Sequence, residues 1–331
     1  MSGALDQSAA DPTALRGRRV GTRRKVSQGH RGQPDASPGG GVRALRRRLV
    51  ISSFLVVPLA LLFTFTYLPL YKMFEYSVQE WDGLSDPTWV GLANYQEIFS
   101  RPDLFGVFRV SLYYLAGAAI QLALALYFAT VLSFRLRFSN VFKGILYFPS
   151  LINGVAIGFI FLYFFKPGGT LDSALSAVGF GEPHPQWLGD QSIINFSLAG
   201  VSVWRYMGLN FVLFLGAIQS ISPDLYEASQ LDGANRWHQF RHIIAPGIRP
   251  ILGLSSVLAI QGSLSAFEMP WIMTGGANGS DTFVTTTVKE AFTFHKVGLA
   301  AAMAVILLLI ILVVTWVQRR ILPDEALESF V

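Results

Sequence analysis

SPDLYEASQLDGANRWHQFRHIIAP, residues 222–246, is a polar and charged stretch in a chain that is otherwise mostly apolar. Ser222 is a preferred N-cap residue, and Pro223 suits the first helical position because an N–H would have no partner there. Asp224 lies favourably at the positive end of the helix dipole. The stretch therefore predicts a short helix from Pro223 to about Leu231.

A sharp turn is predicted directly after this helix. Asp232 and Gly233 permit the chain to reverse, since glycine adopts backbone conformations that other residues avoid. Asp232 is also expected to cap a second helix that begins at Ala234. Pro246 is expected to end that helix, because proline disrupts a helix interior. The sequence thus predicts a helix–turn–helix within a loop at residues 220–248.

The second predicted helix carries an apolar ridge. Trp237, Phe240 and Ile244 recur at the spacing of one helix face, and the charged and amide side chains lie mostly elsewhere. An apolar ridge with a charged rim is typical of a helix that docks into the groove of a partner. We therefore expect this loop to be a docking surface.

The composition is that of an integral membrane protein. Of the 331 residues, 52% are hydrophobic and only 14% are charged, which makes a soluble globular domain improbable. Cysteine is absent, so disulfides, thiolate nucleophiles and cysteine-based metal sites are excluded.

The basic residues are concentrated at the N-terminus. The net charge is +5, and 11 of the 26 Lys and Arg residues lie within residues 1–48. We interpret this cluster as a membrane-orientation signal rather than a nucleic-acid surface. Residues 1–44 lack any hydrophobic period and are expected to be a disordered basic cytoplasmic tail. Residues 321–331 are expected to be a short cytoplasmic C-terminal tail.

Six apolar runs are long enough to cross a bilayer, which requires about 20 residues each. They define a six-span transmembrane domain at residues 45–320, with spans at about 49–71, 105–132, 144–165, 193–219, 249–271 and 297–318.

The loops between the spans alternate in charge. The loop 75–103 has one basic and six acidic residues, whereas the loop 133–143 has three basic residues and no acid. The loop 166–192 has a single lysine, and Arg319 and Arg320 follow the last span. Because Lys and Arg are enriched on the cytoplasmic side, both termini and the 220–248 loop are predicted to be cytoplasmic.

Catalytic and cofactor motifs are not found. No GxxxxGK[ST] sequence occurs, so any ATP hydrolysis must belong to a separate subunit. His238 and His242 are four residues apart, but Gln239 stands where a metalloprotease has its general base, and no metal site is expected. Gly275, Gly276 and Gly279 are interpreted as a turn-forming loop. We predict no catalytic residue and no cofactor.

Two ionisable residues lie within apolar runs. Arg205 falls near the middle of the fourth span, where an unpaired guanidinium costs roughly 2.5–3.5 kcal/mol, and Glu268 lies near the outer end of the fifth. They differ in depth by about nine residues, roughly 14 Å, so a direct ion pair requires a broken helix and is not assumed. Two interpretations stay open. Either these residues only join helices, or they line a polar passage together with Trp204, Tyr206, Asn210 and Trp271.

The quoted stretch resembles a known pattern. Residues 227–246, EASQLDGANRWHQFRHIIAP, are similar to the EAA loop of bacterial ABC importer permeases. Ser229 replaces the second Ala of the motif. The predicted ATPase-coupling residues are Glu227, Ala228, Asp232, Gly233, Ala234, Trp237, Phe240 and Pro246.

Two further stretches resemble the carbohydrate-importing group of that family, the maltose and glycerol-phosphate type. They are VGLANYQEIF (residues 90–99) and FEMPWIMTGGANGSDTFVTTTVKEAF (residues 267–292). In the second, Glu268 replaces Asp and Ala277 replaces Pro. The resemblance covers about residues 45–320.

The resemblance implies an all-α, six-span type I ABC importer permease in a bacterial cytoplasmic membrane, translocating a sugar or oligosaccharide by alternating access. In that family the EAA helices dock onto a cytoplasmic ATPase. Glu227 would make a polar contact with it, Gly233 would allow the turn and Phe240 would help to pack the helices. The implied partners are two ATP-binding-cassette ATPase subunits, a second related permease, an external sugar-binding protein and the lipid bilayer, with no nucleic acid.

Two other classes remain as alternatives. An ion-coupled secondary transporter requires carboxylates near the bilayer midplane, and only Glu268 is available. A membrane-embedded enzyme requires a nucleophile or a paired acid and base within the spans, and none is found.

Overall fold

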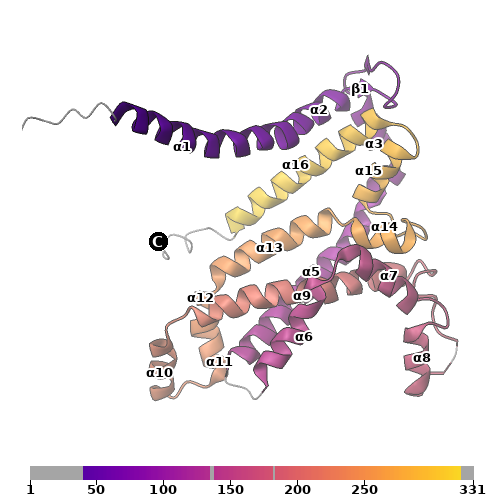
Figure 1. Cartoon of the computed structure of the whole chain (residues 1–331). Helices are drawn as coiled ribbons and strands as arrows, with labels where there is room; N and C mark the ends of the chain where they lie inside the picture. The colour runs from indigo at the N-terminus through magenta and orange to yellow at the C-terminus, as the bar shows by residue number, and fades with distance from the viewer. Residues whose placement is uncertain (1–39, 135–137, 182, 322–331) are drawn as a thin grey trace, which may run out of the picture. The chain divides into compact units, whose positions relative to one another are not determined.

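The computed structural model describes residues 40–134, 138–181 and 183–321, which are mostly helical (Figure 1). The predicted tails at 1–44 and 321–331 lie outside the described residues, except at their inner ends. There, helix α1 (Gly40–Leu62) already begins at Gly40 and α16 (Val297–Ile321) ends at Ile321. The chain divides into two units, residues 1–60 and 61–331.

The first unit contributes most of α1, and the second begins within the same apolar stretch. The helical path runs through the π-helical turn η1 (Phe63–Tyr67) into α2 (Leu68–Ser77). Residues 52–77 are long and apolar enough to cross a membrane.

A short hairpin of strands β1 (Gln79–Glu80) and β2 (Thr88–Trp89) follows, then helices α3 (Ala93–Ser100) and α4 (Pro102–Gly106). Asn94 is buried, and its amide donates to the carbonyl oxygens of Ser77 at 3.0 Å and Gln79 at 2.8 Å. These two hydrogen bonds hold α3, which lies within the VGLANYQEIF stretch, against the end of α2.

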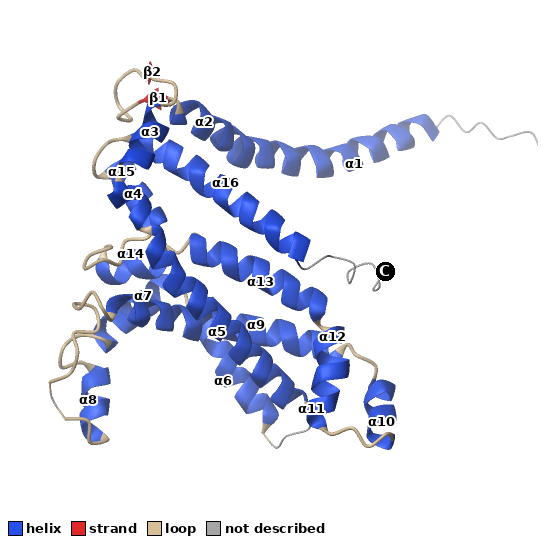
Figure 2. Cartoon of the chain, turned by 180° about the vertical axis from the view of Figure 1, so that it is seen from behind, coloured by secondary structure: helices blue, strands red, loops and turns tan. Residues whose placement is uncertain are grey.

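Helices α5 (Phe108–Ser133) and α9 (Ile194–Gln219) form the most extensive helix pair and lie side by side in both views (Figures 1 and 2). Around α9 pack α6 (Ser139–Leu151), α13 (Arg249–Leu264) and α14 (Glu268–Thr274). Two apolar clusters fill this region, one around Phe211 and Phe214 and one around Ile157 and Leu198.

A third apolar cluster joins α16 to α3, α4 and α15 (Phe283–Phe292). Ion pairs reinforce the same junction, because Lys296 contacts Glu97 at 3.0 Å and Arg101 contacts the buried Glu290 at 3.3 Å. Burial alone would raise the pKa of Glu97, but its hydrogen bonds with Lys296 and Arg101 hold that pKa below its ordinary value. The sequence segments after the first span and before the sixth are therefore packed together.

Five described helical stretches are long and apolar enough to span a membrane, at residues 52–77, 102–133, 194–219, 249–274 and 297–320. The span predicted at 144–165 is not one continuous helix. Helices α6 and α7 (Gly154–Phe164) form a pair bent by 98°, which counts as a sixth span only if the bent pair is taken as one. The break occurs because Asn153 starts a new helix, with its side chain accepting from the Val155 N–H at 2.8 Å.

The remaining helices lie at the two ends of the second unit. At one end are α10 (Pro223–Leu231), α11 (Arg236–Gln239), the π-helical turn η2 (Phe240–Ile244) and α12 (Ala245–Gly247), and we call this the loop end. At the other, the hairpin end, lie the strands and α8 (Thr170–Ala177) (Figure 1).

Candidate functional site

The first half of the 220–248 loop folds as its sequence predicts. The Ser222 hydroxyl accepts from the Asp224 N–H at 3.3 Å and caps α10. Gly233 has φ +78°, a left-handed conformation that favours glycine. The N–H groups of Gly233 and Ala234 donate back to the carbonyls of Gln230 and Ser229, which closes the helix in a Schellman motif. The turn at Gly233 is therefore confirmed.

Two details of the second half differ from expectation. Asn235, not Asp232, caps the second helix by accepting from the His238 N–H at 2.9 Å, so that helix begins at Arg236 rather than Ala234. Pro246 does not end the helical path. The wider turn η2 directly before it accommodates a residue that lacks an N–H, and the path continues through α12.

The apolar ridge of the second helix is used mainly within the chain. Ile244 and Ile248 are fully buried against α5 and α9, and Phe240 packs on the same cluster. The buried Gln239 amide donates to the Ser229 hydroxyl at 2.9 Å and ties the two helices together. The loop is thus firmly attached to the bundle, and of the three ridge residues only Trp237 is exposed.

The exposed apolar surface of the loop comes from one ridge residue, Trp237, and two leucines of α10. Leu225, Leu231 and Trp237 have exposed fractions of 53%, 91% and 64%. Glu227 and Asp232 are exposed on the same loop. Among the remaining predicted coupling residues, Ala228 and Pro246 are exposed and Ala234 and Phe240 are half-buried.

His238 and His242 lie close together within the loop, and both are hydrogen-bonded. The rings of His238 and His242 stack with centroids 6.1 Å apart, and each Nδ1 has a hydrogen-bond partner, Asn235 Oδ1 or the His238 carbonyl. No group of three His, Cys, Asp or Glu side chains placed to hold a metal occurs within the described part of the chain. Burial raises the pKa of Tyr226 at the junction with the bundle.

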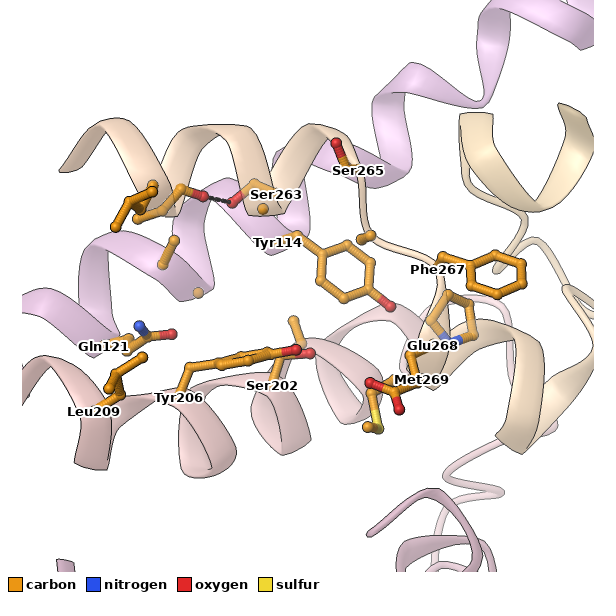
Figure 3. A pocket seen from close by; sticks show the side chains of 18 of the residues that line it. Tyr114, Gln121, Ser202, Tyr206, Leu209, Ser263, Ser265, Phe267, Glu268 and Met269 are labelled. Carbon is orange, nitrogen blue, oxygen red and sulfur yellow. Dashed lines mark hydrogen bonds between the residues drawn. The ribbon is translucent and has the colours of Figure 1, made fainter. Parts of the chain in front are cut away.

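A partly open cavity of about 770 Å³ lies between α5, α9, α13 and α14 of the second unit (Figure 3). Most of its surface is apolar. Its polar lining consists of Tyr114, Gln121, Ser202, Tyr206, Asn210, Ser255, Ser263, Ser265 and Glu268.

Two hydroxyl groups of this lining lack a hydrogen-bond partner. The oxygens of Tyr114 and Ser255 are buried, and the two residues are only 5% and 0% exposed. A buried hydroxyl without a partner costs about 1–3 kcal/mol. Figure 3 shows Tyr114, Gln121, Tyr206 and Glu268 around one common space.

Arg205 and Glu268 form an ion pair. This pair requires a break in the helix that carries Glu268, and the structure contains that break. Residues 265–267 separate α13 from α14, and Glu268 begins α14. Gly154, the first residue of α7, provides the space, since a Cβ there would overlap both the Glu268 carboxylate and the Arg205 guanidinium.

The predicted passage residues fall into two groups. Tyr206, Asn210, Glu268 and Trp271 line the cavity. Arg205 and Trp204 do not belong to its lining. Arg205 lies behind Glu268 and over the Tyr206 ring at 4.9 Å, and Trp204 packs edge-on against Phe161 at 5.2 Å.

Sequence reasoning missed the lining residues of α5 and α13, namely Tyr114, Gln121, Ser255 and Ser263. A signal was available, because Gln and Ser inside long apolar runs are candidates for interior positions. Gly154 carried no comparable signal, since its role depends on side chains of two distant helices.

The fold and the cavity are those of a multi-pass membrane permease, and comparisons with known proteins agree. The family described as "Binding-protein-dependent transport system inner membrane component" matches residues 121–325, and the chain belongs to it. The chain is 32% identical to the osmoprotective compounds uptake permease protein GgtC of Synechocystis, over 81% of this chain and 98% of that protein. It is 29% identical to the arabinooligosaccharides transport system permease protein AraP of Bacillus subtilis, over 71% of this chain and 76% of that one.

A solved structure shows the same fold. A chain of a bacterial alginate ABC transporter, in complex with a periplasmic protein that binds an alginate pentasaccharide, superposes with a TM-score of 0.74. Its sequence identity is 18%, and the match covers 86% of this chain and 97% of that chain. This chain is therefore an inner-membrane permease with the type I ABC importer fold.

Proposed function

We propose that this chain is the permease subunit of an ATP-driven, binding-protein-dependent importer that moves a sugar or oligosaccharide by alternating access. The observation that carries the proposal is the cavity, whose lining combines polar groups such as Gln121 and Asn210 with the rings of Tyr206 and Trp271. Sugars are bound by hydrogen-bonding groups together with aromatic faces, and the cavity offers both. The names of AraP and of the alginate transporter support the saccharide class, whereas GgtC carries osmoprotective compounds. The substrate-path residues are Tyr206, Asn210, Glu268 and Trp271, with Arg205 and Trp204 behind them.

The 220–248 loop is the proposed site of ATPase coupling. Its exposed Leu225, Leu231 and Trp237 offer an apolar surface, and Glu227 lies among them as a polar contact. The attachment through Ile244 would transmit a movement of the partner into α9 and α5. The loop charges favour a cytoplasmic location for this loop and for both termini. Two ATPase subunits, a second permease and an external sugar-binding protein complete the proposed assembly.

A substitution at Gly233 tests the coupling. Gly233→Val places a β-branched residue at φ +78°, which costs about 1–3 kcal/mol of local strain, whereas Gly233→Asn is tolerated there. In complexes with intact partners, we expect the valine variant to lose uptake or subunit assembly and the asparagine variant to keep both. Wild-type uptake and ATPase stimulation in the valine variant would contradict the coupling role.

Purification in mild detergent separates the proposal from the alternatives. A stoichiometric P-loop ATPase should co-purify with this chain. It should dissociate more readily from complexes of the Trp237→Ala variant than from wild-type complexes. Saccharide uptake that follows an ion gradient without any ATPase would favour a secondary transporter instead. The pairing of Glu268 with Arg205 argues against that alternative, because an ion-coupling carboxylate must be free to exchange its ion.

A further inference from the structure

The Glu268 carboxylate is held where three segments meet. It begins α14, pairs with Arg205 of α9 and lies against the first residue of α7, Gly154. The Arg205 guanidinium and the first residue of α7 therefore both lie against one carboxylate. Packing of α7, α9 and α14 therefore fixes the position of this carboxylate.

The two partners of the pair have different access to the cavity. The Glu268 side chain is 35% exposed and belongs to the cavity lining, whereas the Arg205 side chain is 15% exposed and does not. The Arg205 guanidinium also lies over the Tyr206 ring, 4.9 Å from its centroid. A ligand in the cavity thus meets carboxylate oxygens, and the balancing cation stays behind them.

The rest of the lining carries no positive charge. Among the described residues that line the cavity, Glu268 is the only charged side chain, and no Lys, Arg or His is present. The other polar groups are hydroxyls and amides such as Tyr114, Gln121 and Asn210. Ligand hydroxyls can donate to all of these acceptors. A ligand carboxylate would instead meet another carboxylate with no cation to pair with.

We infer that the Arg205–Glu268 pair determines charge selectivity, so that this chain's part of the cavity accepts uncharged polyhydroxyl saccharides and rejects saccharides that carry carboxylates. This inference rests on the proposed function. The carboxylate supplies hydrogen-bond acceptors at the cavity surface, and because Arg205 is not part of the lining, the negative partner is the charge that a ligand meets first. Selectivity of this kind depends on a repulsive element as much as on attractive ones.

Exchanging the two charges provides the test. The double variant Arg205→Glu/Glu268→Arg keeps a neutral pair but brings a guanidinium to the cavity surface. The isosteric Glu268→Gln is a milder second variant in case the exchange disturbs assembly. A matched control is Lys72→Glu/Glu75→Lys, which exchanges an ion pair of similar length, 2.8 Å, outside the cavity.

The measurement is direct binding of maltotriose and of trigalacturonate to the purified complex without its binding protein, with saccharide uptake as a second readout. We expect the ratio of trigalacturonate to maltotriose affinity to rise at least about tenfold in both cavity variants and to stay unchanged in the control. The inference would be overturned if the wild type bound both probes with equal affinity. It would also be overturned if the ratio of trigalacturonate to maltotriose affinity were unchanged in the variants. Either result would leave the proposed function intact. If no saccharide of either kind bound or was taken up by any form, the proposed function would fail as well.

Discussion

Gly208 marks a close approach of two helices, and its replacement by alanine tests whether that approach stabilises the bundle. The residue is buried in α9 opposite the backbone of α6. A Cβ at this position would overlap the Leu146 carbonyl oxygen and lie 2.9 Å from the Tyr147 Cα. Both are backbone atoms, so no side-chain rotation can relieve the clash. The two helices must move apart.

The expected cost follows from overpacking. Inserting a methyl group into a well-packed interior typically costs about 1–3 kcal/mol. A melting temperature changes by about 1.5 °C per kcal/mol in a chain of more than 300 residues. Gly208→Ala should therefore lower the melting temperature by about 1.5–4.5 °C, and the loss should appear in unfolding experiments in detergent or nanodiscs.

Two controls lie on the same helix. A Cβ on Gly200 or Gly216 meets nothing within 4 Å. Because alanine is the better helix former by up to about 1 kcal/mol, Gly200→Ala and Gly216→Ala should leave the melting temperature unchanged or raise it slightly. If the Gly208→Ala variant had the same melting temperature as these controls, the close contact between α6 and α9 would not stabilise the bundle as the geometry requires.

Two further predictions concern the start of α7 and the hairpin end. Asn153→Ala removes the cap of α7 and should cost about 0.5–2 kcal/mol in thermal unfolding, and a variant as stable as the wild type would contradict the cap. Asp172 accepts from the Trp187 indole at 2.8 Å and the Gly168 N–H at 2.7 Å, and these bonds hold its pKa below the ordinary value. A lowered pKa stabilises the fold above the unfolded value of about 3.9 and loses its effect as the pH falls through the folded value. The difference in melting temperature between wild type and Asp172→Asn should thus be constant from about pH 7 to 5 and shrink only below about pH 4. A difference that disappears near neutral pH would be inconsistent with this assignment.

Much of the fold was predictable because its signals are local. The apolar runs at 193–219, 249–271 and 297–318 correspond closely to helical stretches of the structure. The cap at Ser222 and the turn at Gly233 were also predictable, since each depends on residues within a few positions along the chain. The orientation of the loops in the membrane stays a prediction from the charge counts.

The bend between α6 and α7 was missed for a physical reason. The run 144–165 is continuously apolar, and hydropathy measures only the transfer of side chains into lipid. It does not report where a backbone changes direction. Pro149, Asn153 and Gly154 were the local signals, and such residues inside an apolar run do not by themselves decide between a kink and an interior contact.

The candidate site was likewise predictable from the sequence only in part. The sequence by itself determined that the chain spans a membrane, that residues 220–248 form a capped helical loop, and that Arg205 and Glu268 require protein or water around them. Only the tertiary structure decided that these two residues pair, that Glu268 faces the cavity, and that Gly154 leaves room for both. The reason is that caps and transfer energies depend on nearby residues, whereas a contact between positions 63 residues apart depends on how three separate helices pack.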